Sequence, residues 1–315
     1  MGVILCIGTT PAVQRVMVFR KLTLDAVNRA ATTIEGGAGK ALNVAKVLKA
    51  LGEQPVATGF LGGARGEFLR ALLKARGIKL DFVTVQTPTR QCITVIDESA
   101  GTHTELVEES RPVAAGDYDR LMRRIRRQIK HSRAVVMSGT ITPGGPVDFY
   151  FACGQLARAA GAMTVVDAQG PVLIRALACQ PGLVKPNRTE LAATVGRELR
   201  TDAALLAAMR ELHERGAARV VVTAGRGSVL AFDGRCAWQI LPPRIAAVNP
   251  IGSGDAFTAG LVWRLLRGDD LGEACRWGAA AGAANALTMM AGEIEPGSVK
   301  RLARETRVAA VKRSP

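Results

Sequence analysis

The sequence predicts an α/β fold with a mainly parallel sheet and a second, small antiparallel sheet beside it. Short apolar stretches of strand length alternate with longer stretches of helical length. This alternation is typical of βαβ units. Two segments, residues 11–34 and 82–110, instead alternate polar and apolar residues and are rich in Thr, Val and Ile. A period of two is typical of strands with one face in water, so these segments are expected to form the small sheet.

The individual elements follow from the same patterns. We expect strands of the main layer at residues 3–8, 56–60, 134–138, 163–167, 183–185 and 219–223. We expect helices at residues 41–51, 66–76, 117–131, 146–160, 201–215 and 256–266. The chain then divides into a main domain, at residues 1–10, 35–81 and 111–315, and a β lid, at residues 11–34 and 82–110. The basic tail, residues 304–315, is expected to fray.

Length and composition favour a globular protein of the cytoplasm. A chain of 315 residues with 48% hydrophobic residues can bury one large core. No run of 18 apolar residues is present, so no membrane span is expected, and the short apolar N-terminus is interpreted as a strand rather than a signal peptide. The six cysteines form no C-x-x-C pair and the three histidines have no metal-ligand spacing. Scattered cysteines of this kind indicate reduced core residues and a reducing compartment.

The net charge of +15 and the pI near 10.3 allow two interpretations, a nucleic-acid binder or a protein with anionic substrates. The densest basic cluster runs from Arg120 to Arg133 and holds seven Lys or Arg residues. Leu121, Ile125 and Ile129 recur at helical spacing within it, which indicates an amphipathic helix with a solvated basic side. No aromatic residues are interleaved for base stacking, so we do not expect nucleic-acid binding.

Three common nucleotide or catalytic motifs are absent. The Walker pattern fails because Gly39-Lys40 is followed by Ala41 and Ile34 stands where the first glycine belongs. The dinucleotide pattern G-x-G-x-x-G fails around residues 37–42 and 225–230, and the elbow G-x-S-x-G fails at Ser253. These absences disfavour a P-loop NTPase, a dehydrogenase and an α/β-hydrolase.

The most informative stretch precedes the last long predicted helix. Gly252, Ser253 and Gly254 lead directly into an apolar helical segment. The start of a helix offers unpaired N–H groups to an anion, and small residues allow close approach. Asp255 follows, where a carboxylate would repel a resting phosphate but could accept a proton from an attacking hydroxyl. The simpler interpretation is that Asp255 is only a helix N-cap.

This stretch, GSGDAFTAG at residues 252–260, resembles the C-terminal signature of the PfkB carbohydrate kinases. Further resemblances follow in the family's order: AGKALNVA at 38–45, FLGG at 60–63 with Gly66, Thr89-Arg90, SG at 138–139 with PG at 143–144, KPNRTE at 185–190, and TAG at 223–225 with Gly227. The resemblance covers residues 7–291. It implies a ribokinase-like three-layer α/β/α sandwich with a β lid. The T-R pair and AVNRA at 26–30 are similar to the phosphofructokinase and tagatose-6-phosphate kinase branch.

The resemblance also implies roles for individual residues. Asp255 would be the catalytic base, and the backbone of Gly252, Ser253 and Gly254 an anion hole. The sugar or sugar phosphate would be bound by Gln14, Arg29, Gly39, Lys40, Asn43, Arg90 and Ser138. ATP would be bound by Lys185, Asn187, Thr223, Gly225, Gly227 and Asn285. Asn187 and Glu190 would organise Mg²⁺, partly through water.

Two departures from the family pattern concern the acceptor side. The Asp usual in N-P-A-x-D is Gln14 here, which carries no charge. The fourth residue of G-G-K-G is Ala41, which adds a methyl group where the family has glycine. Both departures leave the identity of the sugar open.

Several alternatives therefore remain at the level of sequence. A kinase of an unphosphorylated sugar or a nucleoside is one, although Lys40 and Arg90 favour a phosphorylated acceptor. A binding protein without catalysis is another, although it would gain nothing from Asp255. We also expect that the lid could pair two subunits, since open edge strands can be covered by a second copy.

Overall fold

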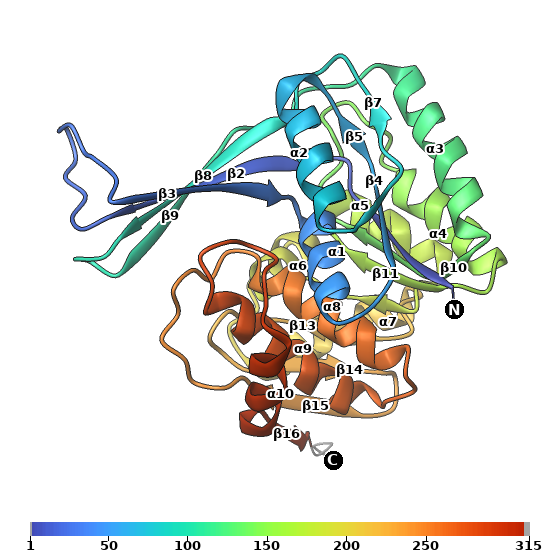
Figure 1. The fold of residues 1–315 in the computed structure, drawn as a ribbon. Coiled ribbons are helices and arrows are strands. Elements are labelled where there is room, and N and C mark those ends of the chain that lie inside the picture. Colours follow the sequence, from blue (N-terminus) through green and yellow to red (C-terminus); the bar gives the residue numbers. More distant parts are fainter. Residues whose placement is uncertain (1, 312–315) are drawn as a thin grey trace.

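A ten-stranded sheet forms the centre of the computed structural model, which describes residues 2–311 (Figure 1). Its strands lie in the order β16-β15-β14-β13-β12-β11-β10-β1-β4-β6. The strands from β6 to β13 pair in parallel, and those from β13 to β16 pair antiparallel. Their bounds are β1 Val3–Ile7, β4 Pro55–Thr58, β6 Lys79–Leu80, β10 Ser132–Ser138, β11 Met163–Asp167, β12 Leu183–Val184, β13 Val220–Val222, β14 Val229–Phe232, β15 Ala237–Leu241 and β16 Arg307–Ala310.

The expected strands of the main layer are all present, but the antiparallel end of the sheet was not predicted. The prediction of a frayed tail is wrong for β16, which pairs with β15 from Trp238↔Ala310 to Leu241↔Arg307. The pairing supplies the backbone hydrogen bonds that a free tail would have to make with water, and the local sequence does not reveal it. The rest of the predicted tail, residues 312–315, lies outside the described residues.

Helices cover both faces of this sheet, so the predicted three-layer α/β/α sandwich is confirmed. One face carries α3 (Ala115–Ile129), α4 (Phe149–Ala159), α5 (Gly170–Ala176), α6 (Arg188–Val195) and α7 (Asp202–Glu214), with the short η1 (Leu177–Cys179). The other face carries α1 (Lys40–Ala50), α2 (Gly63–Ala75), α8 (Ser253–Leu265) and α9 (Leu271–Ala286), and α10 (Pro296–Glu305) packs on α9. Strand β1 shows the division: Leu5 and Ile7 join the first core, Ile4 and Cys6 the second.

The four-stranded small sheet projects from the body, at the left of Figure 1. It contains β2 (Ala12–Phe19), β3 (Thr32–Ala38), β8 (Arg90–Asp97) and β9 (Thr102–Val107) in the order β3-β2-β8-β9. The prediction of a purely antiparallel sheet is wrong at its centre, because β2 and β8 are parallel. The period of two indicates a wet face but not the direction of the neighbouring strand. The short strands β5 (Phe60–Leu61) and β7 (Val83–Thr84) pair separately.

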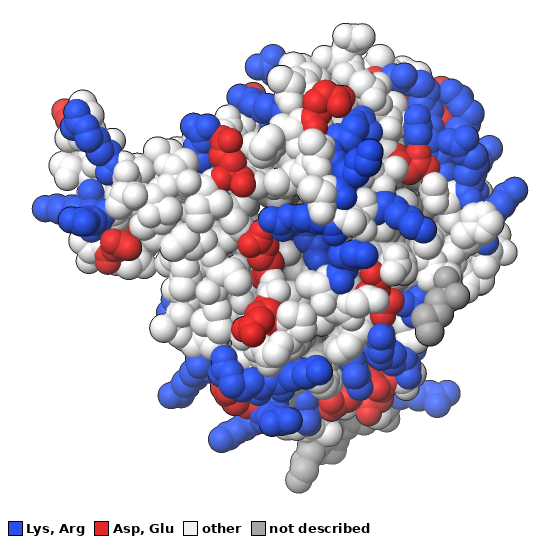
Figure 2. All heavy atoms as spheres, in the orientation of Figure 1, with Lys and Arg blue, Asp and Glu red and all other residues white. Residues whose placement is uncertain are grey.

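The basic segment forms the amphipathic helix that the sequence predicts. Leu121, Ile125 and Ile129 of α3 are buried, and its arginines form part of the basic surface at the upper right of Figure 2. Some of that charge is neutralised locally, since Arg124 pairs with Asp81 at the parallel edge of the sheet.

Two other features concern the whole described chain. The six cysteines are free, and Cys236 is the exposed one among them. Over residues 2–311, no helix combines the length and the apolar character that a membrane crossing requires.

The direction of the strand order reverses between β1 and β10, which fixes where a ligand can bind. The chain runs outward from β1 through β4 to β6, and from β10 through β11, β12 and β13 in the other direction. Ligands of open α/β sheets bind at such a reversal, beyond the carboxyl ends of the strands. The residues that end or follow these strands are Gly8, Thr58, Ser138, Asp167, Lys185 and Thr223.

Candidate active site

Asp255 lies in the first turn of α8, and its carboxylate is buried with 7% of the residue exposed. The interpretation of Asp255 as the N-cap is wrong, because Gly252 takes that position. Gly252 has a left-handed φ of 81°, and a Cβ there would come within 2.7 Å of the Ala291 Cβ. The Asp255 side chain instead accepts a hydrogen bond from Asn43 Nδ2 of α1 at 2.8 Å.

The surroundings of Asp255 suit a proton acceptor. The pKa of Asp255 is raised from 3.8 to about 6: burial is the largest cause and the negative charge of Asp167 adds to it, while Lys40, Asn43 and Lys185 oppose the rise. A base with a pKa just below neutrality is ionised at pH 7 yet binds a proton more tightly than an ordinary carboxylate.

The backbone before Asp255 offers fewer free N–H groups than the sequence suggested. Ser253 donates its N–H to the Pro250 carbonyl at 3.2 Å, which closes a turn. The N–H of Gly254 lies in the first helical turn, where helix geometry provides no internal acceptor. A methyl group added at Gly254 would lie 3.9 Å from Lys185 Nζ, so this ammonium group faces the same turn. Gly254 and Lys185 are therefore the donors best placed for an anion.

Asn285 of α9 forms hydrogen bonds with the turn that precedes α8. Its Nδ2 donates to the Ile251 carbonyl at 2.8 Å, and its Oδ1 accepts the Gly292 N–H at 2.7 Å. The residue is fully buried in α9. Its side-chain amide thus connects the turn before α8 to the turn after α9 through hydrogen bonds.

Asp167, which the sequence analysis did not single out, is the charged centre of the site. Its Oδ1 lies 3.3 Å from Lys40 Nζ and its Oδ2 lies 3.2 Å from Lys185 Nζ and 3.1 Å from Thr258 Oγ1. Burial alone would raise the pKa of Asp167, but the two lysines outweigh burial and lower it. The available signal was its place at the carboxyl end of the predicted strand at residues 163–167.

Lys40 connects Asp167 to the predicted metal pair. Its Nζ lies 2.8 Å from Glu190 Oε1. Burial by itself would lower the pKa of Lys40, but Asp167, Glu190 and Asp255 raise it, so this lysine stays charged.

Asn187 and Glu190 form a capping box at the start of α6. Asn187 Oδ1 accepts the Glu190 N–H at 2.8 Å, and Glu190 Oε2 accepts the Asn187 N–H at 2.8 Å. Over residues 2–311, no group of three or more His, Cys, Asp or Glu side chains could hold a metal. The single carboxylate and amide oxygen suit a hydrated Mg²⁺, which needs few protein ligands.

Three of the residues predicted to bind the acceptor lie beside the carboxyl end of β1. Gly39, Lys40 and Ser138 line a narrow crevice there. The Ser138 hydroxyl is buried and has no hydrogen-bond partner. Gly39 has a φ of 113°, and a Cβ would approach Pro11 Cα to 2.9 Å, so glycine is required at this turn.

Gln14 is fully buried in β2 of the small sheet. Its Nε2 donates to Thr94 Oγ1 at 2.8 Å, while its Oε1 has no partner. Asn43 of α1 likewise has an unpartnered buried Oδ1. An acceptor hydroxyl could supply the hydrogen bond that each oxygen lacks.

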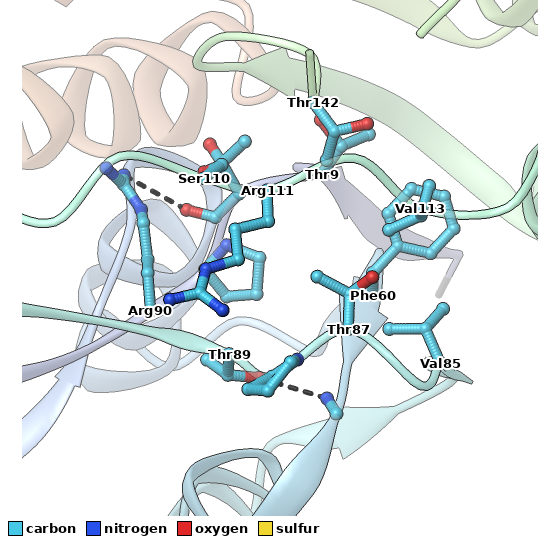
Figure 3. Close-up of a pocket in the computed structure, with 14 residues that line it drawn as sticks. Thr9, Phe60, Val85, Thr87, Thr89, Arg90, Ser110, Arg111, Val113 and Thr142 are labelled. Carbon is cyan, nitrogen blue, oxygen red and sulfur yellow. Dashed lines mark hydrogen bonds between the residues drawn. The ribbon is translucent and has the colours of Figure 1, made fainter. Parts of the chain in front are cut away.

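Arg90 lines a second pocket, which shares Thr10 and Pro11 with the crevice (Figure 3). Arg90 donates to the carbonyls of Thr10 at 3.2 Å and Glu108 at 3.3 Å, and its Nε is unpartnered. Arg111, a residue missed from the sequence, points into the same pocket in Figure 3.

The remaining candidates lie farther out. Arg29 is exposed in the connection between β2 and β3, which forms the blue loop at the far left of Figure 1. Thr223 follows β13 and pairs with Asn187 through a parallel bridge, which places both at the strand ends. Gly225 and Gly227 are exposed in the following loop, and the φ of Gly225 is 57°.

A model of the pfkB family carbohydrate kinases matches residues 1–296. The chain belongs to the PfkB family. A protein of Thermotoga maritima described as a possible 1-phosphofructokinase is 26% identical, with a TM-score of 0.91 over 98% of this chain and 100% of that chain. Phosphofructokinase-2 of Escherichia coli, solved with potassium, is also 26% identical, with a TM-score of 0.87 over 96% and 99%. Ribokinase of Arabidopsis thaliana shares the fold at 20% identity, with a TM-score of 0.75 over 96% and 99%.

Membership of the PfkB family confirms the resemblance read from the motifs and the ribokinase-like fold. The protein is an ATP-dependent carbohydrate kinase. The PfkB signature GSGD and the crevice of Lys40 and Ser138 converge on one edge of the sheet.

Proposed function

We propose that this PfkB kinase transfers the terminal phosphoryl group of ATP to a hydroxyl of a phosphorylated ketohexose, with Asp255 as the base. The observation that carries the proposal is the buried Asp255 carboxylate at the start of α8, with a pKa near 6 and two lysines close by. The acceptor hydroxyl would lie against Asp255 and lose its proton to Oδ1 or Oδ2 as its oxygen attacks the γ-phosphorus.

Lys185 and the N–H of Gly254 would neutralise charge on the transferring group. Both lie at the first turn of α8, and Lys185 forms an ion pair with Asp167. Donors fixed in place before the reaction need little reorganisation, which is why such groups stabilise a developing charge well. Asn285 would act by holding the loop.

The nucleotide would lie along the open edge beyond β12 and β13, against Thr223, Gly225 and Gly227. The exposure of Gly225 and Gly227 leaves room for a ligand, and Asn187 lies beside Thr223. Mg²⁺ would be held near Asn187 and Glu190, with water completing its coordination, and would supply charge neutralisation on the phosphates. Glu190 would have to share its Oε1 between this ion and Lys40.

The choice of a phosphorylated acceptor rests on charge. Lys40 and Arg90 lie on the acceptor side, and each charge-assisted hydrogen bond to phosphate contributes roughly 1.5–3 kcal/mol. Gln14 and Asn43 would contact hydroxyl groups with their unpartnered oxygens. Phosphofructokinase-2 of Escherichia coli, at 26% identity, has been solved in complex with fructose-6-phosphate.

The small sheet would act as a lid over the acceptor and as a contact between two copies of the chain. It leaves β3 and β9 as open edges and exposes several large apolar side chains, Leu24, Val27, Leu106 and Val107. A structure of phosphofructokinase-2 is described as a tetrameric inhibited form, so oligomers occur among the relatives. The free cysteines fit the cytoplasm as the compartment.

A panel of sugar phosphates, free sugars and nucleosides in a coupled ADP-release assay tests the proposal. We expect fructose 1-phosphate, fructose 6-phosphate or tagatose 6-phosphate to give the highest kcat/KM. Faster turnover of a free sugar or nucleoside than of every sugar phosphate would overturn the acceptor class but not the kinase. Binding of sugar phosphate without ADP release by the wild type would favour a protein that only binds sugar phosphate.

A further inference from the structure

Lys46 of α1 is a buried lysine that the site described above does not use. The residue is 5% exposed, and its Nζ donates to the Gly37 carbonyl at 2.6 Å and to the Ala291 carbonyl. No ion pair of Lys46 occurs within residues 2–311. A buried ammonium group with only carbonyl partners is expensive to keep, which indicates a specific task.

The two carbonyls belong to segments that lead to different parts of the candidate site. Gly37 lies near the end of β3, two residues before Gly39, which begins the acceptor crevice. Ala291 lies in the turn after α9, and Gly252 packs against it so closely that a Cβ on Gly252 would come within 2.7 Å. The ammonium group of Lys46 therefore connects the segment that leads to Gly39 with the turn against which Gly252 packs.

We propose that Lys46 is a positioning residue, whose charged ammonium group holds the Gly37–Gly39 segment at the correct distance from the Gly252–Gly254 loop. The residue acts through these two backbone segments and does not contact substrate. The proposal rests on the proposed function for its kinetic readout, but the physical connection can be measured without any substrate.

The charged groups around Lys46 come from four elements. Lys49 lies one turn along α1, Arg76 follows α2, Glu293 lies in the turn after α9, and Asp255 starts α8. Arg76 Nη2 lies 2.6 Å from Glu293 Oε1, so this carboxylate is already paired. The pKa of Lys46 is lowered to about 8: burial is the largest cause and Arg76 adds to it, while Glu293 and Asp255 oppose the fall.

Stability and activity should consequently respond to alkaline pH in opposite directions. The pKa of Lys46 is lower in the folded protein, about 8, than its ordinary 10.5. The unfolded chain therefore binds more protons between these values, and the free energy of unfolding rises with pH there. A neutral amine still donates hydrogen bonds, but charge-assisted ones are roughly twice as strong. Activity should fall as Lys46 loses its charge.

The experiment compares Lys46→Met, Lys46→Arg and the wild type, with Lys49→Met on the same helix as the matched control. The readouts are hydrogen exchange at residues 36–39 and 289–292, and the pH dependence of kcat with ATP and the best sugar phosphate. For Lys46→Met we expect faster exchange in both segments and a roughly tenfold lower kcat, with the KM for ATP within about threefold. For the wild type, kcat should fall through about pH 8, and Lys46→Arg should move that decline above pH 9.

Each arm has a result that overturns the inference. It fails if Lys46→Met exchanges like the wild type in both segments, or if kcat of Lys46→Arg falls through the same pH as that of the wild type. If Lys46→Met does not fold, the pH profiles of the wild type and Lys46→Arg decide. If the wild type phosphorylates no sugar or nucleoside, the proposed function fails, while hydrogen exchange still tests whether Lys46 joins the two segments.

Discussion

Replacement of Asp255 by Asn removes the base but keeps the shape of the side chain and the hydrogen bond from Asn43. We expect kcat to fall roughly a hundredfold or more, the scale of lost general-base catalysis. The same change should stabilise the fold at pH 7. The pKa of Asp255 is raised from 3.8 to about 6, and a shift of about two units corresponds to roughly 3 kcal/mol as an upper limit.

The sign of this effect follows from proton binding. Between pH 3.8 and about 6 the folded wild type binds more protons at Asp255 than the unfolded chain, so its stability falls as pH rises through this range. In Asp255→Asn that decline should disappear. The wild-type kcat should rise with pH through about 6, because only the ionised carboxylate accepts a proton.

The assay pairs ADP release with urea unfolding at pH 4 to 7, and Glu214→Gln serves as the control because Glu214 is exposed at the end of α7. Activity above about a tenth of wild type in Asp255→Asn would refute the assignment of the base. A loss of stability at pH 7 would refute the argument that burial of the charge is unfavourable there.

Three further predictions concern neighbouring side chains. Asp167→Asn leaves the buried Lys185 without its ionic partner, so urea unfolding should show a free energy of unfolding lower by roughly 3 kcal/mol. The rise of kcat with pH should also move to lower pH, because Asp167 raises the pKa of Asp255. A rise of kcat at the same pH as in the wild type would contradict this. Arg90→Ala should raise the KM for the sugar phosphate roughly tenfold or more, with the KM for ATP within twofold. An equal rise in the KM for the free sugar would show that Arg90 does not bind the phosphate group. Glu190→Gln preserves the capping box, so the melting temperature should hardly change. The Mg²⁺ concentration for half-maximal rate should rise roughly tenfold. If that concentration is unchanged, Glu190 does not belong to the metal site.

The signature motifs were predictable because their chemistry is local. The GSGD run followed by an apolar segment favours a helix start through its own residues, and α8 begins there. Asn187 and Glu190 of KPNRTE are close in sequence, so they meet in one capping box. The alternation of strands and helices likewise reflects which faces must be buried. These parts of the prediction needed no knowledge of distant contacts.

Asp167 and Lys46 illustrate what local sequence could not show. Asp167 is one carboxylate at a strand end, and its importance comes from Lys40 and Lys185, which are distant in the chain. In the sequence Lys46 resembles any lysine of an amphipathic helix. Its hydrogen bonds to the carbonyls of Gly37 and Ala291 are visible only in the folded chain. Arg29 was grouped with the acceptor site by resemblance; it is exposed in the connection between β2 and β3, and its role stays a prediction.

The sequence by itself determined the family, the three-layer architecture and the motif that contains Asp255, the proposed base, because periodicity and short motifs depend on residues within one or two turns or strands. Only the tertiary structure decided the direction of β8 beside β2, the pairing of β16 and the charge balance around Asp255. The reason is physical: strand pairing and the pKa of a buried carboxylate depend on groups brought together from distant parts of the chain, and no local pattern records those distances.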